Sequence, residues 1–533
     1  MRDKGQETRK PGRAARLGLG ALSGLPAGCA ALAVAELAAV AVRPEAGPVI
    51  AVGGAAVDRT PGAVKDWAIR TFGTNDKLAL QLGILVVLAL FALALGVLAL
   101  RHRRAGAAGV LLFGAVGAVA ATGRPDSPGV TDALPSVLGA VAGSVLLYFL
   151  AGRLPAPHRA SAGSPEGPGR GWDRRGFVRA ATAAAAASAA AGTLGRVLNG
   201  AGGRDAIASR DDLDLPPADS PAPAVPRGAQ ARVPGVSPFL TPNKDFYRVD
   251  TALVVPKVDA TAWRLRIHGP GVRGPRVLSF ADLLRRELIE RDITLTCVSN
   301  EVGGPYVGNA RWIGVRLADL LADCGVVPPS RGGPADQLVA RSVDGMTIGT
   351  PVEDVMDGRD ALLAVGMNGE PLPFDHGFPV RMVVPGLYGY VSACKWIESL
   401  ELTTFDAYDA YWVERDWARE APVKTQSRID TPKPFARPKA GTVMVAGVAW
   451  AQQRGIDKVE IRIDDGPWQE ATLAAEDSRD TWRQWSYAWQ ATKGGHLLTV
   501  RATDRTGGTQ TEKRTRTVPD GADGWHSVAV TVE

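Results

Sequence analysis

One cysteine in the middle of the chain stands where a reactive or metal-binding thiol is expected. Cys297 follows the alternating stretch Ile293–Thr296 and precedes Val298-Ser299-Asn300, so it ends a predicted strand and begins a turn. A thiolate is both a nucleophile and a soft metal ligand, and small turn-forming residues after a strand favour exposure to a cleft. Two other interpretations stay open: a disulfide with Cys324 or Cys394, or an inert buried thiol.

A second motif gathers cationic side chains. The run Asp375-His376-Gly377-Phe378-Pro379-Val380-Arg381 is followed by Pro385-Gly386 and by Lys395-Trp396. Arginine binds phosphate with a planar fork, and lysine adds a point charge. His376, Arg381 and Lys395 therefore predict cationic donors around one anionic ligand. The alternative is a core strand that begins with a charged residue.

These motifs belong to a longer ordered set. Along the chain it comprises Phe246-Tyr247-Arg248, Cys297-x-x-Asn300, Ala310-Arg311-Trp312, Met367-Asn368-Gly369, the His376–Arg381 run, Pro385-Gly386 and Lys395-Trp396. The set resembles the sulfite oxidase family of molybdopterin enzymes over residues 238–407. The all-β remainder resembles that family's C-terminal, immunoglobulin-like dimerisation domain.

The resemblance implies a molybdenum–molybdopterin cofactor. Cys297 would be the catalytic residue and the protein thiolate on molybdenum. The implied cofactor-binding residues are Tyr247, Arg248, Cys297, Asn300, Arg311, Asp344, His376, Arg381, Ser392 and Lys395. The resemblance also implies oxygen-atom transfer on a small molecule such as sulfite, a separate electron carrier (a cytochrome or quinone-linked protein) and a possible homodimer.

The sequence departs from the family pattern near the expected substrate. Glu301 and Val302 follow the Cys-x-x-Asn motif, where sulfite-oxidising members usually carry arginines. Val249 and Thr251 stand where those members tend to carry Arg and His. This loss of positive charge keeps two alternatives open: a reductase of S-oxides or N-oxides with the same fold, and a binding module that has lost the metal. An extra residue before Lys395 also brings a cysteine, Cys394, close to the cofactor loop.

Residues 1–198 are predicted to form an α-helical membrane domain with about five transmembrane helices. The candidate spans are Leu17–Val42, Leu78–Leu100, Ala105–Thr122, Leu134–Leu150 and Ala180–Leu198. The second has 23 nearly unbroken apolar residues, about 34 Å of helix against a hydrocarbon core of roughly 30 Å. Arg174-Arg175-Gly176-Phe177, ahead of the last span, resembles a twin-arginine export signal.

Charge placement predicts the orientation of these spans. Lys and Arg are dense in residues 1–16, Arg101–Arg104 and 153–179. Placing these clusters in the cytoplasm puts the N-terminus inside and the C-terminal part outside the cytoplasmic membrane. The net charge of +6 then follows from topology, so we expect no nucleic-acid partner. With no histidine in the spans, no C-x-x-C-H and only four cysteines, we expect no haem or iron–sulfur cluster in this chain.

The predicted fold class is therefore multidomain: a helical membrane domain, an α+β molybdopterin-binding domain and an immunoglobulin-like β-sandwich. Residues 199–237 are rich in Pro, Gly and Ala and predict a linker without regular structure. The α+β domain spans residues 238–407, a connector 408–436, and the sandwich 437–533. Ser279-Phe280-Ala281-Asp282 predicts a capped helix start, with the helix running to about Arg291.

Overall fold

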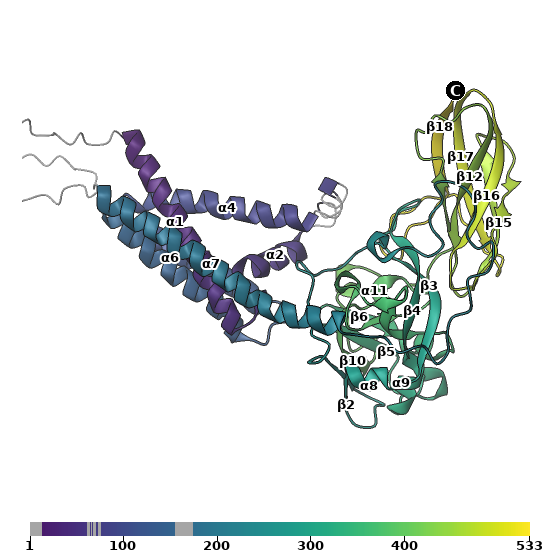
Figure 1. The fold of residues 1–533 in the computed structure, drawn as a ribbon, viewed down its shortest axis with the longest axis horizontal. Coiled ribbons are helices and arrows are strands. Elements are labelled where there is room, and N and C mark those ends of the chain that lie inside the picture. The colour runs from purple at the N-terminus through teal and green to yellow at the C-terminus, as the bar shows by residue number, and fades with distance from the viewer. Residues whose placement is uncertain (1–12, 61–63, 65–66, 68–70, 73–75, 155–173) are drawn as a thin grey trace, which may run out of the picture. The chain divides into compact units, whose positions relative to one another are not determined.

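A computed structural model describes every residue except 1–12, 61–63, 65–66, 68–70, 73–75 and 155–173 (Figure 1). Of the fifteen Lys and Arg residues predicted to mark the cytoplasmic side, six fall in two of these ranges, 1–12 and 155–173, and so lie outside the described residues. The described chain divides into two units. One comprises Met1–Arg204 with Ala252–Val254, and the other comprises Asp205–Thr251 with Val255–Glu533.

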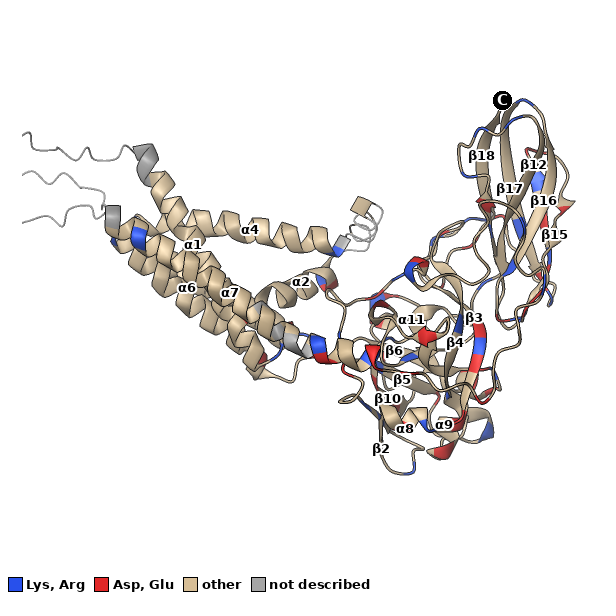
Figure 2. Cartoon of the chain, in the orientation of Figure 1, with Lys and Arg blue, Asp and Glu red and all other residues tan. Residues whose placement is uncertain are grey.

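The first unit is helical. Its helices are α1 (Arg13–Ala41), α2 (Pro48–Arg59), α4 (Asp76–Ala99), α5 (Arg103–Thr122), α6 (Leu134–Gly152) and most of α7 (Arg174–Asp211). Among the described residues, five segments are helical, long and apolar enough to cross a membrane: Leu17–Ala41, Lys77–Arg101, Arg103–Thr122, Val130–Gly152 and Gly176–Gly195. They coincide with the predicted spans to within a few residues, and Figure 2 shows these helices almost free of charged side chains. The segment between the first two predicted spans also contains a helix, α2, which was not predicted.

Small residues let the long helices approach backbone to backbone. A Cβ atom on Gly24 of α1 would lie 1.8 Å from the carbonyl oxygen of Ala92 in α4. A Cβ atom on Gly139 of α6 would lie 2.3 Å from the carbonyl oxygen of Ala31 in α1. Close backbone approach at small residues is typical of helices that associate in a membrane, where burial of apolar surface gives no net driving force.

An ion cluster joins two loops at one end of this bundle. Arg43, just after α1, pairs with Asp126 at 2.7 Å and with the buried Asp132, both from the loop between α5 and α6. Arg124 pairs with Asp126 at 2.9 Å. These two loops lie on the same side of the membrane in the predicted topology, so the cluster agrees with it.

The α+β part of the second unit contains two sheets. The first has the order β2-β1-β10-β5-β6, formed by Arg276–Ser279, Arg264–His268, Ile397–Thr403, Gln337–Ser342 and Thr347–Pro351. The second has the order β3-β4-β7-β8, formed by Leu288–Thr296, Val307–Arg316, Leu362–Met367 and Glu370–Pro371, with β9 (Arg381–Val383) also paired to β7. Short helices α8 (Phe280–Leu284), α9 (Leu317–Asp323), α10 (Val352–Met356) and α11 (Gly389–Ser392) connect the strands. One apolar core that includes Trp312 and Phe378 runs through this region.

The C-terminal part is a sandwich of two four-stranded sheets. One has the order β11-β12-β16-β15, formed by Gln426–Thr431, Gly441–Trp450, Arg483–Ala491 and Thr472–Leu473. The other has the order β14-β13-β17-β18, formed by Gln469–Glu470, Ile456–Ile463, Gly494–Asp504 and His526–Val532. Both sheets contribute to one core around the buried Trp485. Because β11 pairs with β12, the sandwich begins about ten residues earlier than predicted, inside the expected connector.

Two predicted segments differ from the structure. The capping box at Ser279 and Asp282 is present, but its helix ends at Leu284 rather than near Arg291 because Leu288–Thr296 joins the sheet as β3. The predicted linker is helical as far as Asp211, since no proline precedes Pro216. Residues 212–237, named the strap here, then pack along the second unit: Ser220 pairs with Ile289 on the free edge of β3.

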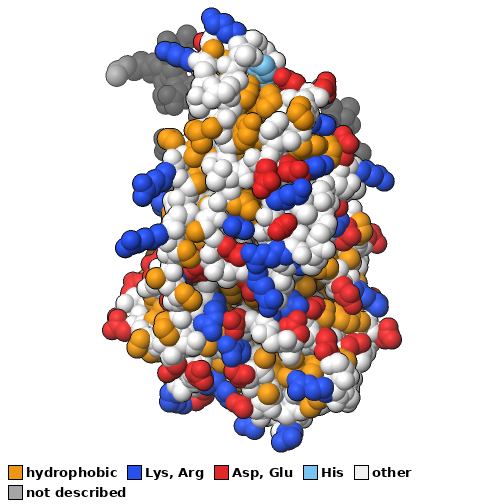
Figure 3. Space-filling view, turned by 90° about the vertical axis from the view of Figure 1, so that its right-hand side faces the viewer, with side chains coloured by type: hydrophobic (Ala, Val, Ile, Leu, Met, Phe, Trp, Pro, Cys, Tyr) orange, Lys and Arg blue, Asp and Glu red, His pale blue; other side chains and the backbone are white. Residues whose placement is uncertain are grey.

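Charged side chains of both signs are interspersed over the face shown in Figure 3. Ion pairs of the second unit include Arg316 with Asp360 at 2.7 Å and Arg419 with Asp409 at 3.0 Å. Positive charge is therefore not gathered into one field on this face, unlike the basic stripe typical of nucleic-acid-binding proteins.

Candidate functional site

The thiol of Cys297 lies at the end of edge strand β3, in a turn held by its own backbone. The Cys297 amide donates to the carbonyl oxygen of Tyr306 at 3.0 Å, and the Asn300 amide donates to the Cys297 carbonyl at 3.0 Å. Sγ lies 2.8 Å from the hydroxyl oxygen of Ser299. Burial raises the pKa of the thiol, while the Ser299 hydrogen bond and the charge of Lys395 oppose this. A bound metal ion deprotonates such a buried thiol, so the environment suits a ligand better than a free nucleophile.

All four cysteines lie in described residues and all are free. The disulfide alternatives for Cys297 are therefore wrong in this structure. Cys324 and Cys394 are buried thiols; burial raises the pKa of both, so neither is poised to react.

Arg381 is a buried cation without a described carboxylate partner. It begins β9, its Nη1 donates to the carbonyl oxygen of His376 at 3.1 Å, and its guanidinium lies 5.0 Å from the centre of the Trp312 ring. Its Nε has no hydrogen-bond partner among the described residues. Burial lowers the pKa of Arg381 to about 10. A buried guanidinium with an unused donor fits an anionic group such as a phosphate, so this residue supports the predicted pterin cofactor.

A network of charges brings the Tyr247-Arg248 motif against Lys395. The ammonium of Lys395 lies 2.8 Å from Asp250 Oδ2 and 3.1 Å from the carbonyl oxygen of Asp375. Arg248 donates to the same Asp250 oxygen at 3.0 Å and to Asp375 Oδ1 at 3.1 Å. Asp250 was not among the predicted residues, although an acidic residue two positions after Arg248 could have been predicted to pair with that arginine.

Asp344 joins the same network from the turn between β5 and β6. Its Oδ2 accepts a hydrogen bond from the hydroxyl of Thr251 at 3.0 Å, and its Oδ1 accepts one from the Met346 amide at 3.3 Å. The aspartate therefore anchors the segment that carries Asp250. Thr251, noted above as a departure from the sulfite-oxidising pattern, serves here as the donor to Asp344.

His376 differs from the prediction in its charge. Nε2 lies 2.9 Å from the carbonyl oxygen of Asn243, which can only accept, so this nitrogen carries the proton. Burial lowers the pKa of His376 to about 4; the Asn243 hydrogen bond opposes this, and the charges of Arg381 and Lys395 add to it. The ring is therefore neutral at pH 7, and the expectation of a third cationic donor is corrected.

Tyr247 is close enough to both Cys297 and Arg381 for their charges to affect the pKa of its hydroxyl. Burial raises the pKa of its hydroxyl, the proximity of Cys297 adds to this, and Arg381 opposes it. Its ring packs on Phe246 with centroids 5.1 Å apart and meets Tyr306 edge-on at 6.3 Å. The hydroxyl keeps its proton at neutral pH and is available as a hydrogen-bond donor beside Cys297.

Comparison with known proteins identifies what this region of the chain is similar to. Residues 252–412 match the family described as "Oxidoreductase molybdopterin binding domain". Mitochondrial sulfite oxidase of Rattus norvegicus is 31% identical over 292 residues, covering 46% of this chain and 52% of that protein. The human enzyme is 30% identical over 331 residues, covering 53% of this chain and 60% of that protein. Residues 252–412 therefore contain a molybdopterin-binding oxidoreductase domain, and this region is similar to the sulfite oxidases.

The chain spans only about half the length of the curated relatives it matches. A solved structure, the sulfane dehydrogenase SoxCD of Paracoccus pantotrophus, is 24% identical with a TM-score of 0.47, covering 55% of this chain and 83% of that one. The predicted resemblance to the sulfite oxidase family, and to molybdenum-dependent oxidoreductases, is confirmed by the domain match and the two sulfite oxidases.

Three predicted residues of the oxidoreductase domain have other partners. Arg311 clasps Asp292 through Nε at 2.8 Å and Nη2 at 2.7 Å. It alternates along β4 with Trp312, which faces Arg381, so it lies on the opposite face of the sheet. The amide oxygen of Asn300 accepts from the Tyr306 amide at 2.8 Å, which shapes the turn after Cys297. The buried hydroxyl of Ser392 donates to the carbonyl oxygens of Leu387 and Tyr388, both at 3.0 Å.

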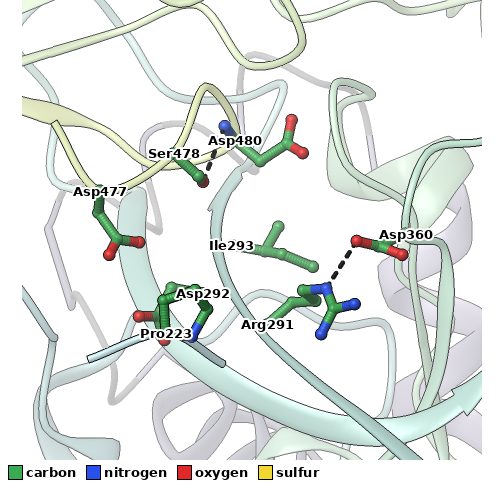
Figure 4. Close-up of a pocket in the computed structure, with 8 residues that line it drawn as sticks. All are labelled: Pro223, Arg291, Asp292, Ile293, Asp360, Asp477, Ser478 and Asp480. Atoms are coloured by element: carbon green, nitrogen blue, oxygen red, sulfur yellow. Dashed lines mark hydrogen bonds and ion pairs between the residues drawn. The ribbon is translucent and has the colours of Figure 1, made fainter. Parts of the chain in front are cut away.

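A cavity of about 100 Å³ lies on the Asp292 side of the oxidoreductase domain (Figure 4). Asp292, Asp360, Asp477, Asp480 and Arg291 line it. Burial, followed by the charge of Asp292, raises the pKa of Asp477 to about 6. Four carboxylates against one guanidinium make this cavity unsuitable for an anionic cofactor. Within the described residues, no group of three or more His, Cys, Asp or Glu side chains is arranged to hold a metal ion.

Proposed function

We propose that this chain is a membrane-anchored, molybdopterin-dependent oxidoreductase that oxidises sulfite or another small sulfur compound outside the cytoplasmic membrane. The observation that carries the proposal is the buried Arg381, whose Nε has no described partner and whose domain also holds the Cys297 thiol. When bound, the cofactor supplies two-electron oxygen-atom transfer, and the protein supplies its position and electrostatic environment. In the forward direction the substrate gains one oxygen atom from water, while two electrons and two protons leave.

Each residue of the site would then have a defined task. Cys297 would provide the thiolate ligand, and Arg381 with Lys395 would hold the negative charge of the pterin phosphate. Neutral His376 fixes the segment around Asn243, and Tyr247 offers a hydroxyl donor near the thiol. Since the sequence predicts no haem or iron–sulfur ligands in this chain, the electrons would pass to a separate cytochrome or quinone-linked carrier.

The location forms part of the same proposal. The five candidate spans would anchor the chain in the cytoplasmic membrane, and the twin-arginine-like motif before α7 would suit export of a domain already folded around its cofactor. The two-sheet sandwich would be immunoglobulin-like and would mediate a homodimer, as the family resemblance implies.

Metal and pterin analysis of the purified full-length protein tests the proposal. We expect near-equimolar molybdenum and pterin, and loss of activity by at least about a thousandfold in Cys297→Ser, because no other described thiol can replace this ligand. Cys324→Ser is the matched control, since Cys324 is also a buried free thiol but lies after α9. Absence of both molybdenum and pterin, from a host that makes the cofactor, would favour a binding module on this fold.

A second candidate is a reductase of S-oxides or N-oxides. The observation that favours it is charge neutralisation: Lys395 and Arg248 share Asp250, and exposed Glu301 follows the Cys297 turn. A site with paired cations has little excess charge for a dianion such as sulfite. Steady-state assays in both directions, with artificial donors and acceptors, separate the two candidates: turnover of sulfite alone would reject the reductase.

A further inference from the structure

The strand that delivers Cys297 is an edge strand with two different neighbours. On one side β3 pairs with β4, with Thr296 opposite Val307 and Thr294 opposite Asn309. On its other side, the end of β3 meets the sandwich: the Thr294 amide donates to the carbonyl oxygen of Asp480 at 2.9 Å. The Thr294 hydroxyl accepts from the Trp482 amide at 2.7 Å. The free edge of the strand is therefore closed by residues some 190 positions later in the chain.

Gln452 contacts this strand nearest the thiol. It follows β12 in the sandwich and is almost completely buried. Its Nε2 donates to the carbonyl oxygen of Thr294 at 2.9 Å and lies 3.3 Å from the hydroxyl oxygen of Thr296. Thr296 is the residue immediately before Cys297.

The other end of the same amide is unsatisfied. Gln452 Oε1 is buried and has no hydrogen-bond partner among the described residues. Leaving a buried polar atom unpaired costs about 1–3 kcal/mol, whereas an apolar side chain of the same shape avoids that cost. Stability alone therefore does not account for a glutamine here, and the two bonds from Nε2 remain as its role.

We propose that Gln452 is a positioning residue for Cys297, so that the sandwich completes the metal-binding thiol of the oxidoreductase domain. The amide fixes the position of the last three residues of β3 relative to the sandwich. It thereby fixes the direction in which the Sγ atom of Cys297 points. Groups that orient a metal ligand are typically worth a factor of about 10–100 in metal affinity or activity. The proposal depends on the proposed function only in taking Cys297 as the ligand.

The test compares Gln452→Leu with Gln484→Leu. Gln484 is an equally buried glutamine of the sandwich whose side-chain amide also bonds two groups, here both of the backbone: it accepts from the Ala231 amide at 2.6 Å and donates to the Ser237 carbonyl at 2.7 Å. Its partners lie in the strap and none belongs to β3. The two substitutions therefore remove similar bonds, and only the first touches the thiol strand.

Two readouts follow, one of which needs no cofactor. In full-length protein from a host unable to make molybdopterin, iodoacetamide labelling of Cys297, located by peptide mass spectrometry, should become at least about fivefold faster in Gln452→Leu, with Cys324 and Cys394 unchanged. In loaded protein, kcat should fall by about 10–100-fold with KM nearly constant, and the Mo(V) electron paramagnetic resonance signal should change. Gln484→Leu should leave both readouts at the wild-type value.

A second pair of variants keeps the test decisive if Gln452→Leu folds poorly. Thr296→Val removes one acceptor and should reproduce the changes, while Thr296→Ser keeps the hydroxyl and should restore the wild-type values. Equal effects of Gln452→Leu and Gln484→Leu, or an unchanged Mo(V) signal with unchanged labelling, would overturn the proposal. If wild-type protein holds no molybdenum, the proposed function fails, and the labelling experiment still decides whether Gln452 positions Cys297.

Discussion

Replacing Arg381 with methionine should raise the stability of the cofactor-free protein and weaken its retention of the cofactor. Burial lowers the pKa of Arg381 from 12.5 to about 10. Each pKa unit corresponds to about 1.4 kcal/mol, so confining this charge costs the cofactor-free protein about 3 kcal/mol. Among the described residues, a hydrogen bond to the His376 carbonyl and the contact with Trp312 offset this cost, each by about 1 kcal/mol.

The net expectation for Arg381→Met is a gain of about 1 kcal/mol in the unfolding free energy of cofactor-free protein. Methionine fills an irregular apolar site and needs no partner. In a chain of this size the gain corresponds to a rise of about 2 °C in Tm. Loss of the charge-assisted bonds to a phosphate should at the same time weaken pterin retention by roughly 30–100-fold, which is about 2–3 kcal/mol.

The gain in stability is measured by thermal scanning of protein from a cofactor-deficient host. The loss of pterin is measured by assay of protein from a host that makes the cofactor. Arg454→Met is the matched control: Arg454 pairs with the buried Asp504 at 2.9 Å, so its loss leaves a buried carboxylate without its guanidinium. That control should melt lower and retain its pterin. The reasoning about Arg381 is refuted if Arg381→Met melts as low as the control and retains pterin equally well.

Two further predictions concern residues outside the cofactor site. Asp477→Asn should raise Tm at pH 7.5 and leave it nearly unchanged at pH 4.5; an equal gain at both values would contradict the prediction. The reason is that the pKa of the Asp477 carboxyl is about 6 in the folded protein, above its ordinary value of 3.8. The folded state therefore loses stability as the pH rises from 3.8 to 6. The loss is about 1–2 kcal/mol after allowance for the half-exposed position of this carboxyl. Gly96→Leu should lower the yield of folded protein in detergent, because a Cβ there meets the Gly20 carbonyl at 2.2 Å; Gly83→Leu, with open space around it, should not.

The parts of this molecule that follow from local pattern were predictable. The spans rest on uninterrupted apolar length, so their bounds agree with the helices to within a few residues. The turn at Cys297 was predicted from strand alternation followed by small residues; Cys297 does follow the end of β3, but its side chain is buried rather than exposed to a cleft. The capping box at Ser279 predicted where a helix begins, but its length depended on sheet pairing further along.

The parts that depend on distant neighbours were not predictable. The charge state of His376 follows from burial beside Arg381 and Lys395, which no local pattern reveals. The pairing of Lys395 with Asp250 joins positions 145 residues apart. Arg311 was in principle recoverable, because alternation along β4 places it on the face opposite Trp312, but this required knowing that the whole stretch is one strand.

The strap has a consequence for how the chain acquires its fold during synthesis. Its residues pair first with β3, where Ser220 meets Leu288, but its later contacts are with the sandwich, where the Ala231 amide bonds Gln484 across 253 positions. Such long-range contacts form slowly because much chain must be ordered before they are made. The end of β3 at Thr294, by contrast, can be closed only after Asp480 and Trp482 have been synthesised. Until that point in synthesis, the Thr294 end of β3 lacks these partners on its second edge.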